Sequence, residues 1–466
     1  MQHNIGIGVT CHNRPEYLVN CIENLNKFMP EGAKLVIVDD ASIVSIKEVT
    51  YRFDKNVGVA AAKNKCLELL EDCEHIFLFD DDCWPISHNW WKPYINSGQP
   101  HLMYIFENFA TGKKLNDTAK IYEDDKIVAY SHARGCMMYY HSSVLSHVGG
   151  MNTDFGKWGY EHPDWSNRIY NAGMTQFRYM DVPGSNKLIY SMDEHQLSFS
   201  TCKGIERRMQ IAKNKPVYES KYYQREYVPY KEGAVEVIPS RVGNTENMVL
   251  TCYFTAVADP QGRSWDANNM QGQIKPLWDS LSGKSNAIVF YDGNGAICRI
   301  NPYFQRWITY RDYLIKHRRE LKFIWCVDAT DVEMLRDPFP GMEEGVLYVG
   351  DEPDTLSSVW LNKHHRHPKL LKKFQYFANC PLLNAGIVGG DIETMIAFTG
   401  LMIDTYQECE HDAKLKGIPG AGLTDMGVLN YVADERFFKL VSHGPHVNTK
   451  FKAYETDNKI AWWKHK

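Results

Sequence analysis

Two clusters of aspartate, each placed where an apolar strand would end, constrain the fold of this chain more than any other feature. The clusters are Asp80, Asp81 and Asp82 after the run 75–79, and Asp328 and Asp331 after the run 323–327. Because residues two apart share a face of an extended chain, Asp80 and Asp82 can converge on one ligand. Paired carboxylates at the carboxyl edge of a buried sheet favour Mg²⁺ or Mn²⁺ with positions left open for phosphates. The sequence thus predicts two metal sites in one chain.

Length and composition indicate two globular domains. A chain of 466 residues is too long for one ordinary hydrophobic core, and its contents of 44% hydrophobic and 23% charged residues are globular values. No run approaches the roughly 20 apolar residues of a membrane-spanning helix, so we expect a cytoplasmic protein. The twelve cysteines form no Cys-x-x-Cys pair, which favours reduced thiols over a disulfide framework or a zinc site.

Short apolar runs alternate with helical patterns in both halves, which predicts parallel sheets covered by helices, an α/β fold. In the first half we expect strands at 5–9, 34–38 and 76–79, and helices at 15–28 and 60–70. In the second half we expect strands at 247–256, 286–291 and 322–327, and helices at 301–317 and 392–407. The pattern predicts two Rossmann-like domains in tandem, over residues 1–200 and 246–466.

The segment between these domains, residues 201–245, has a different composition. Its first thirty-one residues contain eight Lys or Arg against three Glu, and five tyrosines are interleaved with them. The simplest interpretation is a solvated connecting helix and linker. The alternative is a platform for a polyanion or a sugar, because aromatic rings stack and cations hold phosphates.

Five stretches of the first half follow one another in the order of a known family. They are residues 9–15, 36–42, 56–64, 79–82 and 148–173. The first four resemble family 2 glycosyltransferases, and the last is similar to the Gly-Gly…Trp-Gly-x-Glu-Asp pattern of galactosyltransferase-like relatives. The resemblance implies a GT-A fold, a nucleotide-sugar donor (most often a UDP-sugar), and Mn²⁺ or Mg²⁺ as cofactor.

The resemblance also implies roles for single residues. Asp39 would bind the uracil or ribose of the donor. Further donor-binding positions are Asn13, Arg14, Asn64 and Asp81. Asp80 and Asp82 would hold the metal that bridges the diphosphate and stabilises the leaving nucleotide, with His195 as a further ligand.

One position departs from the family pattern. Where relatives have Glu-Asp, with the Asp as catalytic base, this chain has Glu161-His162. An inverting transfer needs a group that deprotonates the acceptor hydroxyl and has a pKa near the working pH. His162 has a suitable ordinary pKa, and Glu161 or Asp164 could also serve. The base therefore stays open among these three, and a site that only binds is the alternative.

The second half resembles other GT-A-like transferases in shorter stretches. They are residues 323–339, 349–352, 384–390 and 424–430. The resemblance implies metal binding by Asp328 and Asp331, completed by His446 or, as second choice, His443. It implies donor or acceptor contacts by Asn384, Ala385, Gly386 and Asp425. The small residues at 385 and 386 would let a ligand approach the backbone closely.

Together these patterns predict a bifunctional, metal-dependent glycosyltransferase that adds sugars to hydroxyls of a glycan or glycoconjugate. No P-loop, dinucleotide fingerprint or Gly-x-Ser-x-Gly elbow is present, which argues against those enzyme classes. One alternative is a viral enzyme acting on hydroxymethylated DNA, although the net charge of −5 gives no global attraction to nucleic acid. The other is one active transferase domain beside a sugar-binding module.

Overall fold

A computed structural model shows a chain of two compact units, Met1–Ile238 and Pro239–Lys466. The structure describes residues 4–44, 46, 49–199, 204–237, 246–292, 298–452, 455 and 458–465. The expected connecting segment, 201–245, does not stand apart: its helix α6 (Gly204–Lys221) and the residues up to 237 belong to the N-terminal unit. The expected boundary at residue 200 therefore moves to residue 238.

The N-terminal unit is built on a mixed sheet in the order β3-β2-β1-β4-β9-β6. Its strands are β1 (Ile5–Cys11), β2 (Lys34–Asp39), β3 (Tyr51–Arg52), β4 (His75–Asp80), β6 (His101–Met103) and β9 (Met137–His141). The first four are parallel, whereas β9 is antiparallel to both β4 and β6. The central strands β1 and β4 are almost wholly buried because helices cover both faces.

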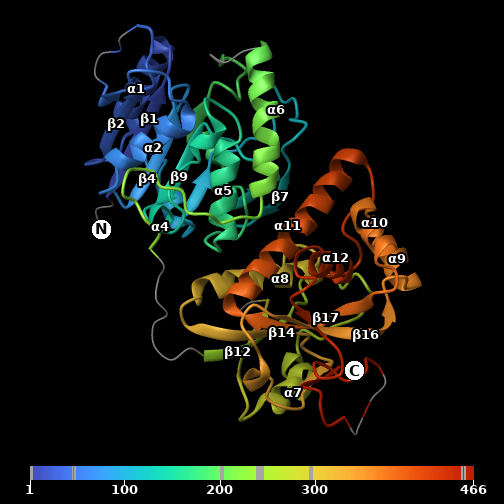
Figure 1. Ribbon diagram of the computed structural model, residues 1–466. Helices are drawn as coiled ribbons and strands as arrows, with labels where there is room; N and C mark the ends of the chain where they lie inside the picture. Colours follow the sequence, from blue (N-terminus) through green and yellow to red (C-terminus); the bar gives the residue numbers. More distant parts are fainter. Residues whose placement is uncertain are drawn as a thin grey trace. The chain divides into compact units, whose positions relative to one another are not determined.

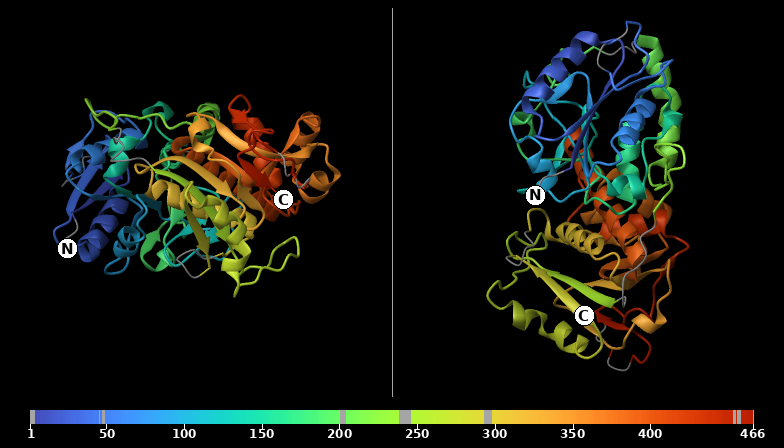
Figure 2. Two further views of the ribbon diagram at one scale, coloured as in Figure 1. Left: turned by 90° about the horizontal axis from the view of Figure 1, so that it is seen from below. Right: turned by 90° about the vertical axis from the view of Figure 1, so that its left-hand side faces the viewer.

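The helices of this unit form where apolar residues recur at helical spacing. They are α1 (Pro15–Phe28), α2 (Val59–Leu69), α3 (Lys92–Asn96), α4 (Ser143–His147) and α5 (Glu161–Asn171), besides α6. Helix α1 begins with proline, whose fixed φ suits the first turn, and buries Leu18, Cys21 and Leu25. Helices α1 and α2 lie on opposite faces of the sheet (Figure 2). The expected doubly wound layers are thus confirmed.

Shorter elements surround this sheet. A small sheet contains β7 (Lys120–Glu123), β8 (Val128–Tyr130) and β10 (Met180–Asp181), and a second pairs β5 (Cys83–Pro85) with β11 (Ile189–Ser191). Two 3₁₀ turns occupy Thr153–Phe155 and Ser185–Lys187. The β5–β11 pair matters for function, because it brings residues after 191 back beside the end of β4.

The sheet of the C-terminal unit has the order β13-β12-β14-β17-β16-β18. Its strands are β12 (Glu246–Tyr253), β13 (Asn286–Tyr291), β14 (Leu321–Val327), β16 (Leu347–Thr355), β17 (Pro381–Asp391) and β18 (Val441–Ser442). In both sheets the first strand, β1 or β12, pairs in parallel with two neighbours, β2 and β4 or β13 and β14. An antiparallel strand, β9 or β17, then joins β4 to β6 or β14 to β16. The strand that precedes the acidic cluster, β4 or β14, occupies the same place in both sheets.

Helices cover both faces of this second sheet as well. They are α7 (Met270–Leu281), α8 (Pro302–Lys316), α9 (Val359–His364), α10 (Pro368–Tyr376), α11 (Ile392–Lys416) and α12 (Met426–Arg436). Helices α8, α11 and α12 lie on one face and α7 on the other (Figure 1). The strand β15 (Val332–Met334) pairs with β19 (Trp463–His465), and a 3₁₀ turn spans Phe339–Gly341. The β15–β19 pair carries the end of the chain to the acidic cluster.

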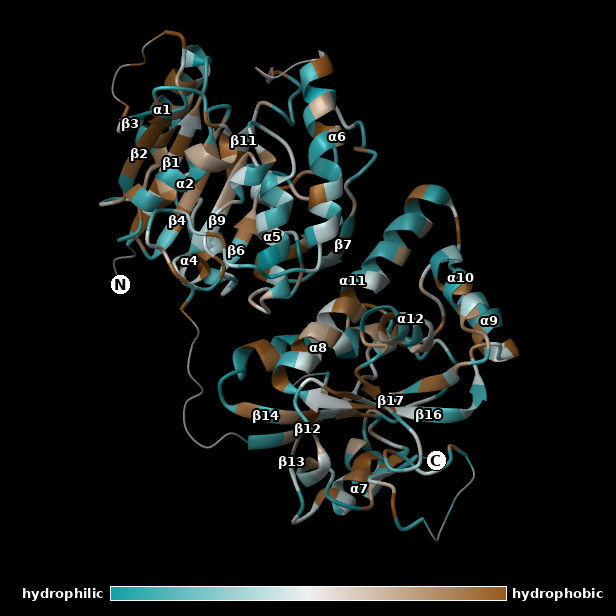
Figure 3. Ribbon diagram, viewed as in Figure 1, coloured by the Kyte–Doolittle hydropathy of each residue, from teal (hydrophilic) through white to brown (hydrophobic). Residues whose placement is uncertain are grey.

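Hydropathy follows this layering. The central strands are hydrophobic, and the helices turn hydrophilic residues outward (Figure 3). Among the helices in the described part of the chain, none combines the length and apolar character needed to cross a bilayer. Eleven cysteines are free thiols, mostly buried, and Cys202 lies outside the described residues.

Candidate active sites

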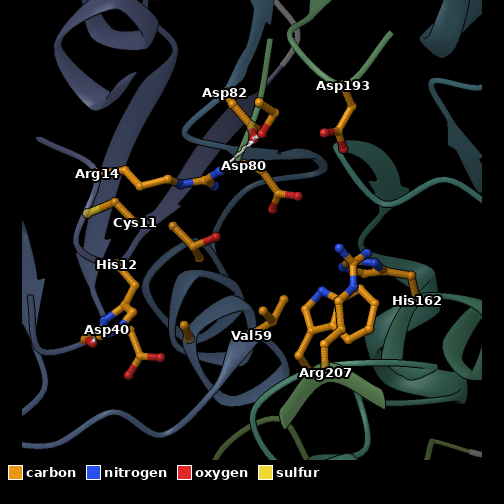
Figure 4. Close-up of a pocket in the computed structure, with 14 residues that line it drawn as sticks. Cys11, His12, Arg14, Asp40, Val59, Asp80, Asp82, His162, Asp193 and Arg207 are labelled. Atoms are coloured by element: carbon orange, nitrogen blue, oxygen red, sulfur yellow. Dashed lines mark hydrogen bonds and ion pairs between the residues drawn. The ribbon is translucent and has the colours of Figure 1, made fainter. Parts of the chain in front are cut away.

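A cavity of about 260 Å³ opens in the N-terminal unit where β1 and β4 end (Figure 4). Such carboxyl ends are where open α/β sheets bind ligands. Its charged and aromatic lining consists of His12, Arg14, Asp40, Asp80, Asp82, Trp158, His162, Asp193 and Arg207. Figure 4 shows Asp80, Asp82 and Asp193 in one part of the cavity and His162 and Arg207 in another.

Arg14 holds the acidic cluster in place. It donates to both carboxylate oxygens of the fully buried Asp81, and its Nη1 lies 2.7 Å from Asp82 Oδ2. Asp82 also accepts from Ser198. Asp81, predicted to contact the donor, faces Arg14 and is not among the residues that line the cavity. Its role here is to fix the guanidinium.

Asp80 faces a lysine that sequence reasoning missed. Lys63 is fully buried on α2, and its Nζ lies 2.8 Å from Asp80 Oδ1 and 2.9 Å from the Gly135 carbonyl oxygen. Burial raises the pKa of Asp80, and Lys63 opposes that rise. The signal was a lysine directly after the apolar residues 59–62, at a helix position where a buried, unpaired ammonium would be costly.

Asp193 joins the two predicted metal ligands in the cavity. Burial raises the pKa of Asp193, and repulsion from Asp82 and Asp80 adds to the rise. Three mutually repelling carboxylates provide the hard oxygen donors that a divalent cation prefers. The predicted ligand His195 does not line the cavity; its ring stacks on Tyr190 at 4.4 Å.

Three predicted donor-binding residues support the backbone around the cavity. Asp39 is fully buried and accepts from Ser42 and Arg52. Asn13 accepts from the Ile43 amide, and Asn64 exchanges two hydrogen bonds with the Met151 backbone at 2.8 and 2.9 Å. The neighbours His12 and Asp40 line the cavity instead, and Asp40 accepts from the amides of residues 57 and 58.

The candidate bases lie at the start of α5. Glu161 is 3% exposed, and burial raises its pKa to about 7. His162 lines the cavity; burial, and then Lys63, hold its pKa well below the ordinary range. Neither Glu161 Oε2 nor His162 Nε2 has a hydrogen-bond partner among the residues that the structure describes. Of the two, His162 lines the cavity, and Glu161 is buried beside it, with Oε1 3.7 Å from His162 Nδ1.

Asp164, the third candidate, is engaged in the protein. Its Oδ2 accepts from Arg168 Nε at 3.0 Å, and both side chains are buried. Arg168 also donates to the carbonyl oxygens of Val148 and Gly150. The Asp164–Arg168 pair thus anchors the Gly149-Gly150 turn, where Gly149 has a φ of +74° and a Cβ would lie 1.8 Å from the Val228 carbonyl oxygen. Because its carboxylate is already paired with Arg168, Asp164 is a weaker candidate for the catalytic base than Glu161 or His162.

The raised pKa of Glu161 predicts a pH-dependent stability. Because the folded state holds this proton more tightly than the unfolded chain, the contribution is complete below pH 4.5 and is lost as the pH rises to about 7. Over this pH range the contribution of Glu161 to the free energy of unfolding falls by about 3 kcal/mol. Glu161→Gln should therefore raise the free energy of unfolding at pH 8 by about 2 kcal/mol and leave it nearly unchanged at pH 5. Urea denaturation at both pH values measures this, with the exposed Glu31→Gln as control; equal effects at the two pH values would contradict it.

The C-terminal unit brings together Asp328, Asp331 and His465 after β14. Ligand atoms of these three residues lie within 4.8 Å of one another, and they are the one such group of His, Cys, Asp or Glu found in the described ranges. Burial, with Asp328 nearby, raises the pKa of Asp331 to about 7, and burial lowers the pKa of His465 to about 4. Two carboxylates and a neutral imidazole fit Mn²⁺ or a similar ion.

Arg306, on α8, is the central cation of this second site, and sequence reasoning missed it. It pairs with Asp328 and Asp425 and donates to the Ala385 carbonyl oxygen at 2.9 Å. Burial acts to raise the pKa of Asp328, but Arg306 and His465 hold it below its ordinary value. Asp425 also accepts from Trp307 Nε1 at 2.6 Å. Asp425 therefore positions Arg306. It does not line the cavity that lies beside Asp328 and Asp331 in this unit.

The Asn384-Ala385-Gly386 turn lies on β17 beside Asp328. Asn384 donates to Glu352 Oε1 at 2.6 Å and accepts from the Gly386 amide at 2.7 Å. A Cβ on Gly386 would lie 2.7 Å from Asp328 Oδ2 and from the His465 ring. The small residue thus makes room for these two side chains, where the sequence led us to expect a ligand.

The histidine expected in the second metal group is a different one. His446 Nε2 lies 3.0 Å from Ser442 Oγ, and His443 Nδ1 lies 2.9 Å from Asp351 Oδ2. Neither belongs to the group with Asp328 and Asp331; His465 does. We expected a histidine near the end of the chain, but not the pairing of β19 with β15 that brings His465 beside the aspartates.

Family comparisons identify the N-terminal unit. Residues 7–99 match the model of glycosyl transferase family 2, and residues 119–195 match that described as the N-terminal domain of galactosyltransferase. The first match contains β1, β4 and the aspartates, and the second contains α5 with Glu161 and His162. The N-terminal unit is therefore a glycosyltransferase domain. More particularly, a family 2 segment is followed by a galactosyltransferase-type segment, in the order that the sequence motifs predicted.

Solved structures give weaker likenesses. A mannosyltransferase from Pyrobaculum calidifontis in complex with GDP-Man and Mn²⁺ aligns with 37% of this chain at 15% identity and a TM-score of 0.28. GalNAc-T7 with UDP, GalNAc and Mn²⁺ aligns with 49% of this chain at 13% identity and a TM-score of 0.35. This chain spans about half the length of each, 54% and 53%. No curated protein sequence matches the chain.

Proposed function

We propose that the N-terminal unit transfers a sugar from a UDP-sugar to a hydroxyl of a glycan or glycoconjugate, with Mn²⁺ or Mg²⁺ as cofactor. The observation that supports this proposal is the cavity itself, whose lining includes Asp80, Asp82, Asp193 and His162. A divalent ion held by these carboxylates would supply positive charge to the diphosphate that departs. The family match supports the reaction class.

The protein groups divide the remaining work. Glu161 accepts the proton of the acceptor hydroxyl, since a pKa of about 7 leaves it a base near neutral pH. The acceptor oxygen forms the new bond to the sugar carbon, and the nucleoside diphosphate leaves with the electron pair. His162, held neutral by burial, receives or donates a hydrogen bond at the same oxygen.

For the C-terminal unit we propose a second nucleotide-sugar site, so that the chain is bifunctional. Five strands of its sheet, β13-β12-β14-β17-β16, correspond in order to β2-β1-β4-β9-β6 of the N-terminal unit, and its acidic group follows the corresponding strand β14. Asp328, Asp331 and His465 would hold the ion there. The adjoining cavity, of about 80 Å³, is lined by Tyr253, Trp265 and other residues beside Asp328 and Asp331, and these aromatic faces suit a base or a sugar.

Binding of UDP-sugars and GDP-mannose with Mn²⁺ tests both proposals. We expect calorimetry to show two donor-binding events in the wild type. Asp80→Ala/Asp82→Ala should remove one of them, and Asp328→Ala/Asp331→Ala should remove the other. If one double variant keeps both binding events, the unit that carries its substitutions is a scaffold or a binding module. Absence of any nucleotide-sugar binding would refute the proposed function.

A further inference from the structure

Helix α6 brings a cation to the first cavity from outside both family matches, which end at residue 195. Arg207, Asn214 and Tyr218 are seven and four residues apart, so they share one face of this helix. The contacts of Asn214 and Tyr218 turn that face toward the body of the N-terminal unit, whereas Ile205 and Met209, elsewhere on the helix (Figure 3), are exposed. The position of Arg207 thus depends on how Asn214 and Tyr218 are held.

Asn214 and Tyr218 fix the helix firmly. The Asn214 amide nitrogen lies 2.7, 3.1 and 3.1 Å from the carbonyl oxygens of Phe155, Trp158 and Gly159, and the residue is 2% exposed. Tyr218 stacks on Tyr160 with ring centroids 4.8 Å apart. Both contacts are to the loop that leads directly into Glu161 and His162.

Arg207 is presented to the cavity by this arrangement. Its guanidinium carbon lies 4.1 Å from the ring centroid of Trp158, and both side chains line the cavity with His162. No carboxylate of the described ranges forms an ion pair with Arg207, whereas Arg14 is fully committed to Asp81 and Asp82. An exposed guanidinium stacked on an indole is a ready partner for a planar or phosphate anion.

We propose that Arg207 selects an acidic acceptor, by binding a carboxylate or phosphate on the sugar that carries the accepting hydroxyl. This inference rests on the proposed function of the N-terminal unit. The acceptor must meet Glu161 or His162, and Arg207 is held on Trp158, only three residues before Glu161. The metal-binding carboxylates lie across the cavity (Figure 4).

Matched saccharides test the proposal with UDP and Mn²⁺ saturating. The probes are p-nitrophenyl glucuronide, p-nitrophenyl glucoside and its 6-phosphate, which share one ring and differ in charge. We expect the wild type to bind at least one charged probe about tenfold more tightly than the glucoside, because a charge-assisted hydrogen bond contributes that much. The two charged probes separate carboxylate from phosphate recognition.

Three variants test whether the preference for a charged probe over the glucoside comes from Arg207. Arg207→Gln should abolish it, Arg207→Lys should retain part of it, and Arg208→Gln, on the same helix but outside the cavity lining, should leave it intact. The affinity for UDP with Mn²⁺ should be equal in all four proteins. Equal binding of all three probes by the wild type would overturn the proposal. A loss of UDP affinity in Arg207→Gln would also overturn it, because Arg207 would then bind the nucleotide-sugar donor. Salt-sensitive DNA binding without any saccharide preference would overturn it as well. A wild type that binds no UDP refutes the proposed function itself.

Discussion

Asp82→Asn is expected to lower sugar transfer by the N-terminal unit about a thousandfold, equivalent to about 4 kcal/mol of transition-state stabilisation. The carboxylate faces the cavity with Asp80 and Asp193, and its removal takes one anionic ligand from the proposed metal site. Transfer from the donor found in the binding experiment, followed by release of the nucleotide, measures the loss.

The fold should survive this change. Arg14 keeps its ion pair with Asp81, and an asparagine oxygen at position 82 can still accept from Ser198. Asp80 is a poorer choice, because its loss would leave the buried Lys63 ammonium without a carboxylate. Asp72→Asn, at an exposed pair with Lys34, is the matched control and should retain full activity. An Asp82→Asn enzyme with near-normal transfer would exclude Asp82 from the metal site.

Arg306→Met should destabilise the C-terminal unit by about 3 kcal/mol, because it leaves buried carboxylates without their cation. Asp425 is 1% exposed, and its Oδ2 accepts from Arg306 Nε at 2.9 Å. In the variant, Asp425 would keep only one of the two residues whose side chains donate hydrogen bonds to it, Trp307. Chemical denaturation followed by tryptophan fluorescence gives the free energy of unfolding.

Two further variants isolate the cause. Arg318→Met removes a partly exposed pair with Glu393 and should cost less than 1 kcal/mol. Arg306→Met/Asp425→Asn should recover part of the lost stability, because the stranded negative charge at 425 is removed as well. A double variant as unstable as Arg306→Met alone would show that packing, and not charge, accounts for the effect.

The strand and helix pattern of this chain could be predicted from its sequence because local periodicity determines it. The expected helix over 301–317 corresponds to Pro302–Lys316, and the expected strand over 322–327 corresponds to Leu321–Val327. The position of the aspartates at the ends of β4 and β14 follows from the same apolar runs. The motif order also gave the glycosyltransferase class of the first half.

The partners of those aspartates could not be predicted, because they come from distant parts of the chain. Lys63 and Arg306 lie on helices whose sequences do not show which distant carboxylate each cation meets, and Asp193 arrives through the β5–β11 pair. The sequence analysis chose His446, or His443 as second choice, whereas the pairing of β19 with β15 places His465 beside Asp328 and Asp331. Asp39 and Asp164 match family positions, yet local hydrogen bonds already occupy them.

The attachment of α6 has a consequence for how this enzyme could change over evolutionary time. The strands and loops that carry the proposed metal and base residues lie within the matched family regions, whereas Arg207 lies on a helix appended after them. Asn214 and Tyr218 keep that helix in place independently of what residue 207 is. Substitutions at one exposed turn could therefore redirect the enzyme to other acceptors while donor chemistry is inherited unchanged.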